Sequence, residues 1–310
     1  MAMTIRPIRP EELEACCALG GGGLADAVRR FWKEGRSSPD VCFVAEQDAK
    51  PVGRVYFHHG PSSTERYMFG MYVDDSVDFR ETGRELLGTA LTGLAQSGAT
   101  CAMAAIYDIY EKNPARKQEL LESFGFRQFQ EKKRYVWQDS GVEVEVPTRL
   151  EFRSLAVVGE DAFTEAARRV TEGTLDRADQ ADLAKHGLGA AGRMYMAVLK
   201  DVEFLPDEWQ LGYLDDGRLC GLVGPQRIVV GNEGTINYIG VVPELRGTGH
   251  GFDLLMKGTA LLQRRGLKTV VAETDVENLP MHAALERAGY THQGTLQGFR
   301  CDLTTHPADG

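Results

Sequence analysis

The segment Val241–Gly251, which reads VVPELRGTGHG, places three glycines at alternate positions directly after Arg246. The apolar, β-branched residues 235–242 before the loop predict a strand, and Phe252–Leu262 after it predicts a helix. The first N–H groups of a helix have no partner within the helix and carry about half a positive charge. Because glycines let a ligand approach these groups closely, the loop is suited to bind a pyrophosphate beside the arginine.

Two other glycine motifs fit this loop less well. The sequence contains no GxxxxGK(S/T) stretch of a Walker loop. The GxGxxG fingerprint of a Rossmann fold would use Gly247 and Gly249, but Phe252 occupies its third glycine position. Glu273 does follow about twenty residues later, as a ribose-binding acid would. However, the loop comes late in the chain, after predicted hairpins, and this position disfavours a dinucleotide-binding fold.

The elements that must position the loop occur twice along the chain. Each half begins with a short predicted strand, Ile5–Ile8 or Phe152–Leu155, and a polar helical stretch follows. Paired strands come next in both halves. The predicted hairpins span 41–45 with 52–58, and 210–214 with 219–223. A third hairpin, with its turn at 231–234, leads into the strand before the loop, and residues 139–148 form a linker or a crossing strand.

The two halves differ in charge at the loop. Aligning Leu254 with Leu86 matches the apolar faces of two predicted helices and puts Asp78 at the position of Arg246 and Glu81 at that of Gly249. Like charges about 4 Å apart repel by roughly 4 kcal/mol at an effective dielectric constant near 20. The loop of the first half would therefore repel a pyrophosphate. We expect one nucleotide-type site, in the second half.

The composition limits the classes of partner. The chain has 310 residues, a formal net charge of −10 and a pI of about 5.3, so it has the length of two domains and an acidic surface. An acidic chain is not expected to bind nucleic acid or an anionic membrane, and it is compatible with a cationic substrate. We find no membrane span and no secretory signal, which predicts a cytoplasmic protein. The six scattered cysteines predict reduced, partly core-buried thiols and no metal site.

Two motifs resemble one known family. The pattern V-x-P-x-x-R-G-x-G-x-G after a strand resembles motif A of the GNAT superfamily of acyl-CoA-dependent N-acetyltransferases. The segment Glu277–Tyr290, ENLPMHAALERAGY, resembles the second family motif at the expected distance, and the two motifs together are specific. The resemblance covers about Thr148–Leu303. A degraded copy covers residues 3–138, where Glu122–Phe126 is similar to the end of the second motif.

This resemblance implies an α/β fold with two tandem GNAT domains, each a mixed, mostly antiparallel sheet flanked by helices. Residues 1–140 would form a degenerate GNAT-like domain without a cofactor, and 148–310 a domain that uses acetyl-CoA as a co-substrate. The pantetheine would lie where the strand before the loop separates from the next predicted strand, 269–274. The implied cofactor-binding residues are Ile239, Gly240, Val241, Val242, Arg246, Gly247, Thr248, Gly249, His250, Gly251 and Asn278.

Acetyl transfer to an amine requires a base. Keeping a lysine-like amine, with a pKa of about 10.4, neutral near pH 7 costs roughly 4–5 kcal/mol. Asp275, at the end of the predicted strand 269–274, is our first candidate for a base, acting through water or by holding the amine. Glu233 is the second, because strict alternation puts it on one strand face with Ile239 and Val241. A solvated turn or cap carboxylate would explain either residue as well.

The general acid is less clear from the sequence. Many GNAT enzymes carry a tyrosine seven residues after the asparagine of the second motif, and here that position is Leu285. His282 is a candidate for the role, although an ordinary helix-surface histidine has the same pattern. We expect His250 to point away from the phosphates and Tyr290 to pack in the core. The main-chain N–H near Val241 is the expected oxyanion donor.

The acceptor is constrained only by charge. In GNAT proteins the region of residues 175–182 folds over the acceptor, and its three aspartates would favour a cationic acceptor, although a solvated helix face explains them too. We expect an N-acetyltransferase that moves an acetyl group from acetyl-CoA to a primary amine of a small molecule, as a monomer or homodimer. A longer acyl donor stays open. The alternative is a non-catalytic acyl-CoA-binding or sensor protein that has lost the chemistry with the tyrosine.

Overall fold

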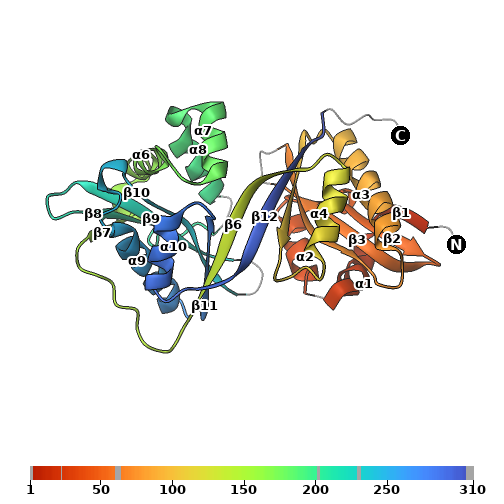
Figure 1. Cartoon of the computed structure of the whole chain (residues 1–310), viewed down its shortest axis with the longest axis horizontal. Helices are drawn as coiled ribbons and strands as arrows, with labels where there is room; N and C mark the ends of the chain where they lie inside the picture. The colour runs from red at the N-terminus through yellow and green to blue at the C-terminus, as the bar shows by residue number, and fades with distance from the viewer. Residues whose placement is uncertain (1–2, 22, 60–63, 201–202, 229–231, 305–310) are drawn as a thin grey trace. The chain divides into compact units, whose positions relative to one another are not determined.

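The structure, a computed structural model, describes residues 3–21, 23–59, 64–200, 203–228 and 232–304. The chain forms two compact units, each built from strands and helices (Figure 1). Unit 1 comprises Met1–Phe129 and Gln297–Gly310, and unit 2 comprises Gln130–Leu296. The predicted domains, 1–140 and 148–310, are continuous in sequence, whereas unit 1 is assembled from two separate segments.

Unit 1 contains a mostly antiparallel sheet in the strand order β1-β2-β3-β4-β5, with β12 beside β5. Strands β1 to β4 pair antiparallel, and β4 pairs parallel with β5. Helix α3 buries an apolar face that packs in the core of this unit, as the alignment of Leu86 with Leu254 predicted. The elements are β1 (Met3–Pro7), α1 (Leu13–Ala18), α2 (Ala25–Lys33), β2 (Cys42–Gln47), β3 (Lys50–His58), β4 (Glu65–Val73), α3 (Phe79–Gln96), β5 (Cys101–Tyr107) and α4 (Pro114–Ser123).

Unit 2 repeats the same plan in the strand order β7-β8-β9-β10-β11-β6. Strands β7 to β10 pair antiparallel, β10 pairs parallel with β11, and β6 pairs antiparallel with β11. The elements are β6 (Arg127–Gln138), β7 (Glu151–Ser154), α5 (Leu155–Val158), α6 (Glu160–Thr171), α7 (Arg177–His186), α8 (Leu188–Lys200), β8 (Gln210–Tyr213), β9 (Leu219–Arg227), β10 (Gly234–Val241), α9 (His250–Arg264), β11 (Thr269–Asp275), α10 (Leu279–Arg287) and β12 (Thr291–Asp302).

These bounds confirm the predicted first strands and both fully described hairpins to within a few residues. The third hairpin is confirmed as the antiparallel pair β9–β10, but Gly231 of its turn lies outside the described residues. Residues 139–148 form no regular element. All six cysteines lie among the described residues, are buried and form no disulfide bond, which agrees with the prediction of reduced thiols. Within the described ranges, each helix is too short or too polar to cross a lipid bilayer.

The two halves of the sequence exchange strands. From Gln130 onward, β6 belongs to unit 2, where Tyr135 and Trp137 pack in the core although the strand follows the helices of unit 1 in sequence. From Gln297 onward, β12 belongs to unit 1, where Phe299 and Cys301 pack in the core. The core of unit 2 therefore requires residues that precede the linker 139–148.

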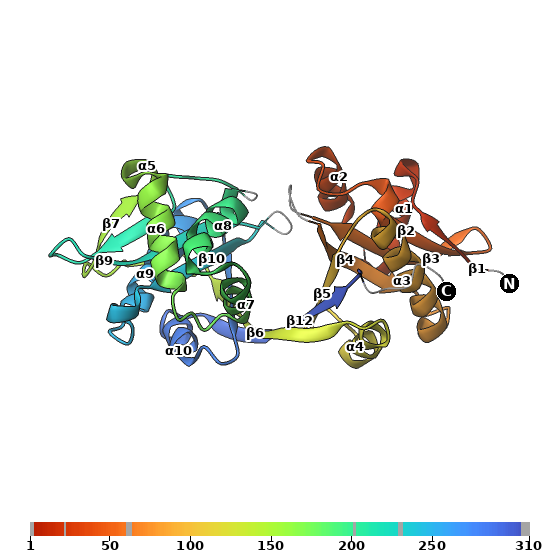
Figure 2. The ribbon, with the colours of Figure 1, turned by 90° about the horizontal axis from the view of Figure 1, so that it is seen from above.

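Two layers of helices cover the sheet of unit 2 on opposite faces (Figure 2). Helices α6 and α8 pack together on one face, where α6 buries Phe163, Ala166, Ala167 and Val170 in the i, i+3, i+4, i+7 pattern of an apolar helix stripe. Helices α9 and α10 cover the other face, and Leu254 of α9 is fully buried there. Strands β9 and β10 contact both α6 and α9, so any cavity beside β10 lies between the two layers.

A β-bulge in β10 changes which side chains share a face. Ile236 packs in the core on the α9 side, whereas Tyr238 packs in the core on the α6 side, although strict alternation would put them together. The register with β9 shifts between these two residues, so Asn237 is the inserted residue of a bulge. The predicted alternation that put Glu233 on the face of Val241 is therefore wrong, because one extra residue reverses the faces beyond it.

Candidate active site

Strands β10 and β11 separate after a short paired stretch. Their parallel pairing is recorded only at Gly234 with Val270 and Thr235 with Val271, although β10 continues to Val241. Paired strands lie about 4.8 Å apart, so separation leaves one edge of β10 without a ladder partner. This is the gap that the sequence predicted between these two strands.

A groove of about 400 Å³ begins at this gap and reaches the start of α9. Its wall combines the strand edge, the glycine loop, the end of α6 and the face of α10. The lining residues are Val170, Gly173, Thr174, Leu175, Ile239, Gly240, Val241, Arg246, Gly247, Gly249, Gly251, Phe252, Asn278, Pro280, Met281, Ala283, Ala284 and Arg287.

The start of α9 is open to a ligand. Gly249 is its N-cap residue, with a φ of 86°, and no side chain caps the helix. Gly247 also has a positive φ, 78°, so both positions favour glycine on conformational grounds. Gly251 lies in the helix with ordinary geometry, and a Cβ there would come no closer than 3.9 Å to a neighbour. The main-chain conformation at residue 251 therefore does not require glycine, but the missing side chain leaves space in the groove.

Neighbouring side chains hold the glycine loop in place. Arg149 donates to the carbonyl of Gly249 at 3.3 Å and to the fully buried carboxylate of Asp253 at 2.8 Å. His250 Nδ1 lies 3.0 Å from the other oxygen of Asp253, so the imidazole turns toward the helix, as expected. Thr248 donates its hydroxyl to the carbonyl of Leu245 at 2.5 Å. The side chains at 248 and 250 thus support the loop, and neither residue lines the groove.

Arg246 has a structural role that the sequence did not reveal. Its Nε donates to the carbonyl of Val241 at 3.1 Å. Its two other nitrogens donate to the carbonyls of Val170, Glu172 and Gly173 at 2.7–2.9 Å. The guanidinium therefore joins the end of β10 to the connection between α6 and α7. It lines the groove and contributes positive charge there, but its donors are used within the protein.

Along the free edge of β10, only every second residue points its main-chain N–H and C=O groups toward the gap. The N–H of Val242 donates to the carbonyl of Cys220 on β9 at 2.9 Å, and the Val242 side chain is fully buried. Since main-chain groups alternate in direction along a strand, those of Ile239 and Val241 point away from β9 toward the gap. A cofactor can thus pair with Ile239 and Val241, whereas Val242 is turned the wrong way. Gly240 supplies close packing, because a Cβ there would lie 2.8 Å from Cβ of Val170.

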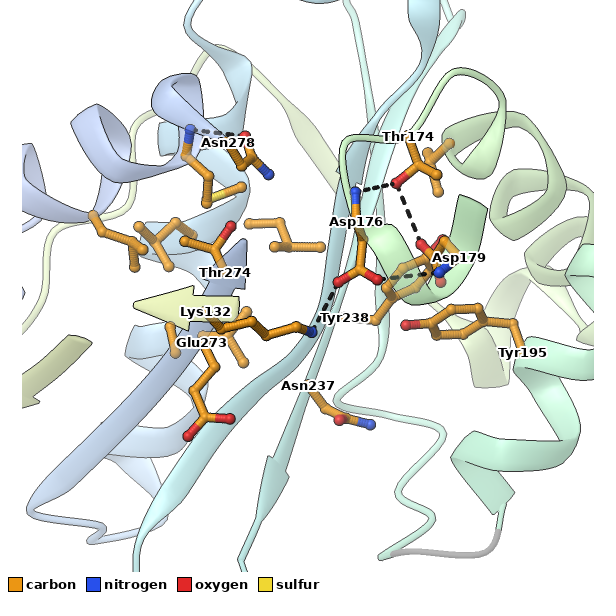
Figure 3. Close-up of a pocket in the computed structure, with 17 residues that line it drawn as sticks. Lys132, Thr174, Asp176, Asp179, Tyr195, Asn237, Tyr238, Glu273, Thr274 and Asn278 are labelled. Atoms are coloured by element: carbon orange, nitrogen blue, oxygen red, sulfur yellow. Dashed lines mark hydrogen bonds and ion pairs between the residues drawn. The ribbon is translucent and has the colours of Figure 1, made fainter. Parts of the chain in front are cut away.

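A second cavity, of about 130 Å³, adjoins the groove. The two share a wall made of Val170, Thr174, Ile239, Asn278 and Met281. Figure 3 shows the polar side chains around this cavity, which come from β6, β10, β11, α7 and α8. Its other lining residues are Lys132, Asp176, Asp179, Tyr195, Ile236, Asn237, Tyr238, Leu255, Ala272, Glu273, Thr274 and Leu285.

Comparison with known proteins finds a family match in the second half of the chain. Residues 186–290, from the end of α7 to the end of the second motif, match the family described as Acetyltransferase (GNAT). This match places a GNAT acetyltransferase region within unit 2. Mycothiol acetyltransferase from Arthrobacter sp. (strain FB24) is 40% identical over 58 residues, which span 19% of this chain and 18% of that protein.

Solved structures show that the whole chain has a tandem GNAT fold. A GCN5-related N-acetyltransferase from Sphaerobacter thermophilus superimposes with a TM-score of 0.70 at 18% identity, covering 97% of this chain and 96% of that one. A tandem GNAT protein from the clavulanic acid biosynthesis pathway gives a TM-score of 0.60 at 14% identity, covering 99% of this chain and 100% of that one. Both likenesses include the two units, so the repeat read from the sequence is a repeat of the GNAT fold.

Asn278 and Leu285 of the second motif both line the second cavity. Asn278 is the N-cap of α10, where its side-chain oxygen accepts from the N–H of Met281 at 3.3 Å, and it lines both cavities. Leu285 is fully buried and faces the second cavity. Tyr290 packs in the core, as expected, with its hydroxyl 2.7 Å from that of Thr259.

The predicted bases do not line either cavity. Asp275 is 2% exposed, and its Oδ2 accepts from Gln130 Nε2 at 3.1 Å and from the N–H of Arg177 at 3.2 Å. Burial and the charge of Asp176 raise the pKa of Asp275. Through these hydrogen bonds, Asp275 at the end of β11 holds the start of α7 and residue Gln130 of β6 in position. Glu233 pairs with Arg134 at 3.4 Å, near the end of β10 that is far from the glycine loop.

His282 also lies outside both cavities. The side chain is buried, and Nε2 lies 3.0 Å from the carbonyl oxygen of Asp275. Burial lowers the pKa of His282, so the imidazole is neutral near pH 7 and donates to that carbonyl. The helix-surface position expected from the sequence is thus incorrect, since α10 turns this residue toward the end of β11. In this position His282 supports β11 and does not face a substrate.

Lys132 is a site residue that the sequence analysis missed. It extends from β6 into the second cavity, where Nζ lies 2.8 Å from Oδ2 of Asp176 (Figure 3). Burial disfavours both charges, but their mutual attraction outweighs it, so the pKa of Lys132 is raised and that of Asp176 is lowered. The pair is therefore ionised near pH 7. No local signal marks Lys132, because it comes from a strand that the first half of the sequence contributes to unit 2.

Two stacked tyrosines form another wall of this cavity. The rings of Tyr195 on α8 and Tyr238 on β10 lie 3.4 Å apart between centroids, at an angle of 22°. The hydroxyl of Tyr238 lies 2.7 Å from that of Thr171 on α6. Burial raises the pKa of both tyrosines, so both are neutral near pH 7. They bring a rigid, uncharged aromatic surface to the acidic side of the cavity.

Proposed function

We propose that unit 2 is an N-acetyltransferase that moves the acetyl group of acetyl-CoA to a primary amine of a small molecule. The observation that carries this proposal is a groove that reaches from the uncapped start of α9 along the free edge of β10 and shares lining residues with a second, polar cavity. The match to the GNAT family supports acyl transfer as the class of reaction. The three carboxylates that line the second cavity support an amine as the acceptor.

The residues fit acetyl-CoA. The main-chain N–H groups at Gly249–Gly251 would hold the pyrophosphate, because the helix dipole favours an anion and no protein side chain competes for the position. Ile239 and Val241 would pair with the amides of the pantetheine. When bound, acetyl-CoA supplies an activated thioester. The N–H of Val241 would donate to the oxygen of the acetyl group as negative charge develops on it.

The test is release of free CoA thiol by the purified full-length protein. Acetyl-CoA is offered with a panel of small primary amines, and matched alcohols and thiols are run beside them. We expect thiol release that depends on the amine and a product of the mass of the N-acetyl amine. Chemical release without protein sets the background. Binding of acetyl-CoA without turnover on any acceptor would contradict the enzyme and favour the second function below.

A non-catalytic acyl-CoA-binding protein is the second candidate. Leu285 favours it, because this buried side chain cannot donate a proton to a leaving thiolate at the position where many GNAT enzymes have a tyrosine. The two candidates share the cofactor groove and differ in the second cavity. Substitutions at the groove should abolish binding of acetyl-CoA in both, whereas only an enzyme should depend on the carboxylates of the second cavity.

A further inference from the structure

The second cavity contains one carboxylate without a cationic partner. Three carboxylates line it: Asp176, Asp179 and Glu273. Asp176 pairs with Lys132 at 2.8 Å, and Glu273 pairs with Arg134 at 3.3 Å. Among the described residues, no lysine, arginine or histidine lies within ion-pair distance of Asp179. If all four lining charges are ionised, the cavity is net negative and Asp179 is its unneutralised anion.

Asp179 is held at the junction with the cofactor groove. Its Oδ2 accepts from the hydroxyl of Thr174 at 3.3 Å, and Thr174 lines both the groove and the second cavity. The main chain of Asp179 is fixed as well, because Asp176 Oδ1 caps the start of α7 by accepting from the N–H groups of Ala178 at 2.9 Å and Asp179 at 3.1 Å. In Figure 3 this carboxylate lies next to Asp176 and above the ring of Tyr195.

The surroundings of Asp179 bring its pKa into the range that is useful for proton transfer at neutral pH. Burial and the charge of Asp176 raise the pKa of Asp179 to about 7, and Lys132 opposes this only in part. The other charged or titratable groups around it are Asp182 on its own helix, Tyr195 on α8 and Tyr238 on β10, which either add negative charge or stay neutral. A carboxylate that gains and loses a proton near pH 7 suits general base catalysis at that pH.

We propose that Asp179 binds the ammonium group of the acceptor and removes its proton, with the Lys132–Asp176 pair holding it in position. This inference rests on the proposed N-acetyltransferase function and names the base that the reaction needs. It assigns the acceptor to the class of primary amines that arrive protonated.

The proton and bond changes balance as follows. One proton passes from the ammonium to Oδ of Asp179 and later to water. The neutral nitrogen forms the amide bond as the C–S bond of the thioester breaks. The second proton lost by the nitrogen neutralises the departing thiolate. The products are the N-acetyl amine, the free thiol and one released proton, so no oxidant or metal is required.

The pH dependence of kcat/KM tests this role. In the wild type, the ammonium and ionised Asp179 must meet, so kcat/KM rises to about pH 7 and then stays level until the amine itself loses its proton. In Asp179→Asn only the free amine can react. At neutral pH we expect a loss of roughly 100- to 1000-fold. The loss should shrink steadily as the pH approaches the pKa of the amine.

A matched control and a binding-independent readout accompany this test. Asp215→Asn makes the same charge change at an exposed residue in the turn between β8 and β9, outside both cavities, and should keep the level region. NMR titration of the aspartate carboxyl carbons, on the protein without acetyl-CoA, should show a group that titrates near pH 7 and is lost in Asp179→Asn. This readout also verifies that the variant is folded.

The outcomes separate this inference from the proposed function. Wild-type turnover on amines with an unchanged pH profile in Asp179→Asn would overturn the role of Asp179 and leave the proposed function standing. The absence of a carboxyl group titrating near neutral pH would also overturn it. No wild-type turnover on any amine would refute the proposed function and this inference together.

Discussion

The starts of α3 in unit 1 and α9 in unit 2 are corresponding parts of the same fold with opposite properties. Each helix connects the two strands of a parallel pair that separates early, since β4 and β5 are paired only at residues 65–67 with 101–103, and β10 and β11 only at 234–235 with 270–271. In unit 1 the N-cap Asp78 accepts from the N–H of Glu81 at 2.8 Å, so a carboxylate of the protein already occupies the anion position. In unit 2 Gly249 leaves that position open. The fold supplies the helix dipole, and the residue at the cap decides whether a ligand can use it.

The cavities beside these helices also differ in the elements that line them. In unit 1 a cavity of about 250 Å³ is lined only by residues of α3 and α4. In unit 2 the groove extends past α9 and α10 to Ile239–Val241 on the open edge of β10. A ligand in unit 2 can therefore contact both a helix start and a strand edge. The comparison predicts that bringing the charge of unit 1 into unit 2 will close the site.

Gly251→Glu is the substitution with the largest expected effect on the affinity for CoA. A Cβ at 251 has free space, so the variant should fold, but its carboxylate enters the groove where the pyrophosphate would lie. Repulsion at about 4 Å is worth roughly 4 kcal/mol before screening by salt. We therefore expect affinity for CoA to fall by at least about 100-fold. Isothermal titration calorimetry measures the change.

Gly251→Gln is the control for size in this experiment. It places an uncharged side chain of nearly the same volume in the groove. The difference between the two variants isolates the charge, and it should diminish as the salt concentration rises. If both variants lose the same affinity for CoA, side-chain volume alone accounts for the loss. That result would contradict an electrostatic difference between the two units.

The sequence predicted the helix starts well because their determinants are local. Strand, glycine loop and helix follow one another in Thr235–Leu262, and the charge reversal at Asp78 was visible by alignment alone. The proposed pyrophosphate site would need only main-chain groups of this segment. Likewise, Asn278 was recognised because a cap is set by its own helix.

The second cavity was not predictable in the same way because its parts are distant in sequence. Lys132 reaches it through strand exchange, and an exchanged strand has the same local pattern as one that stays in its own unit. The bulge at Asn237 moved Glu233 off the predicted face by a single inserted residue. Asp179 belongs to a run of aspartates that also fits a solvated helix. Only its burial beside Asp176 makes its carboxyl unusual, and that depends on the tertiary fold.

The pH dependence of stability distinguishes a carboxylate that caps a helix from one that is buried without a cation. Asp78 and Asp176 each cap a helix, but Asp179 is half-buried without a cation. Its pKa is raised to about 7 when folded, above its ordinary value, so the folded state binds the proton more tightly than the unfolded state. Wild-type stability should therefore fall as the pH rises from about 4 to 7 because of this group.

Asp179→Asn removes that dependence. Above pH 7 the variant should be more stable than the wild type by about 1–3 kcal/mol, and near pH 4 the difference should vanish. Urea unfolding at a series of pH values measures this, with Asp215→Asn, in the exposed turn between β8 and β9, as the control that should follow the wild type. A difference that grows as the pH is lowered would have the opposite sign and would contradict a raised pKa at Asp179.

The smallest predicted effect comes from opening the cap of unit 1. Asp78→Ala should cost about 1 kcal/mol of stability, because the N–H of Glu81 loses its partner, while Asp78→Asn should retain most of the cap. Binding of CoA is then measured in the Gly251→Glu background, where unit 2 is closed, so any binding regained must come from unit 1. We expect none, because the carboxylate of Glu81 still stands at the start of α3. Binding regained by Asp78→Ala alone would mean that a single cap residue separates a GNAT cofactor site from its silent copy.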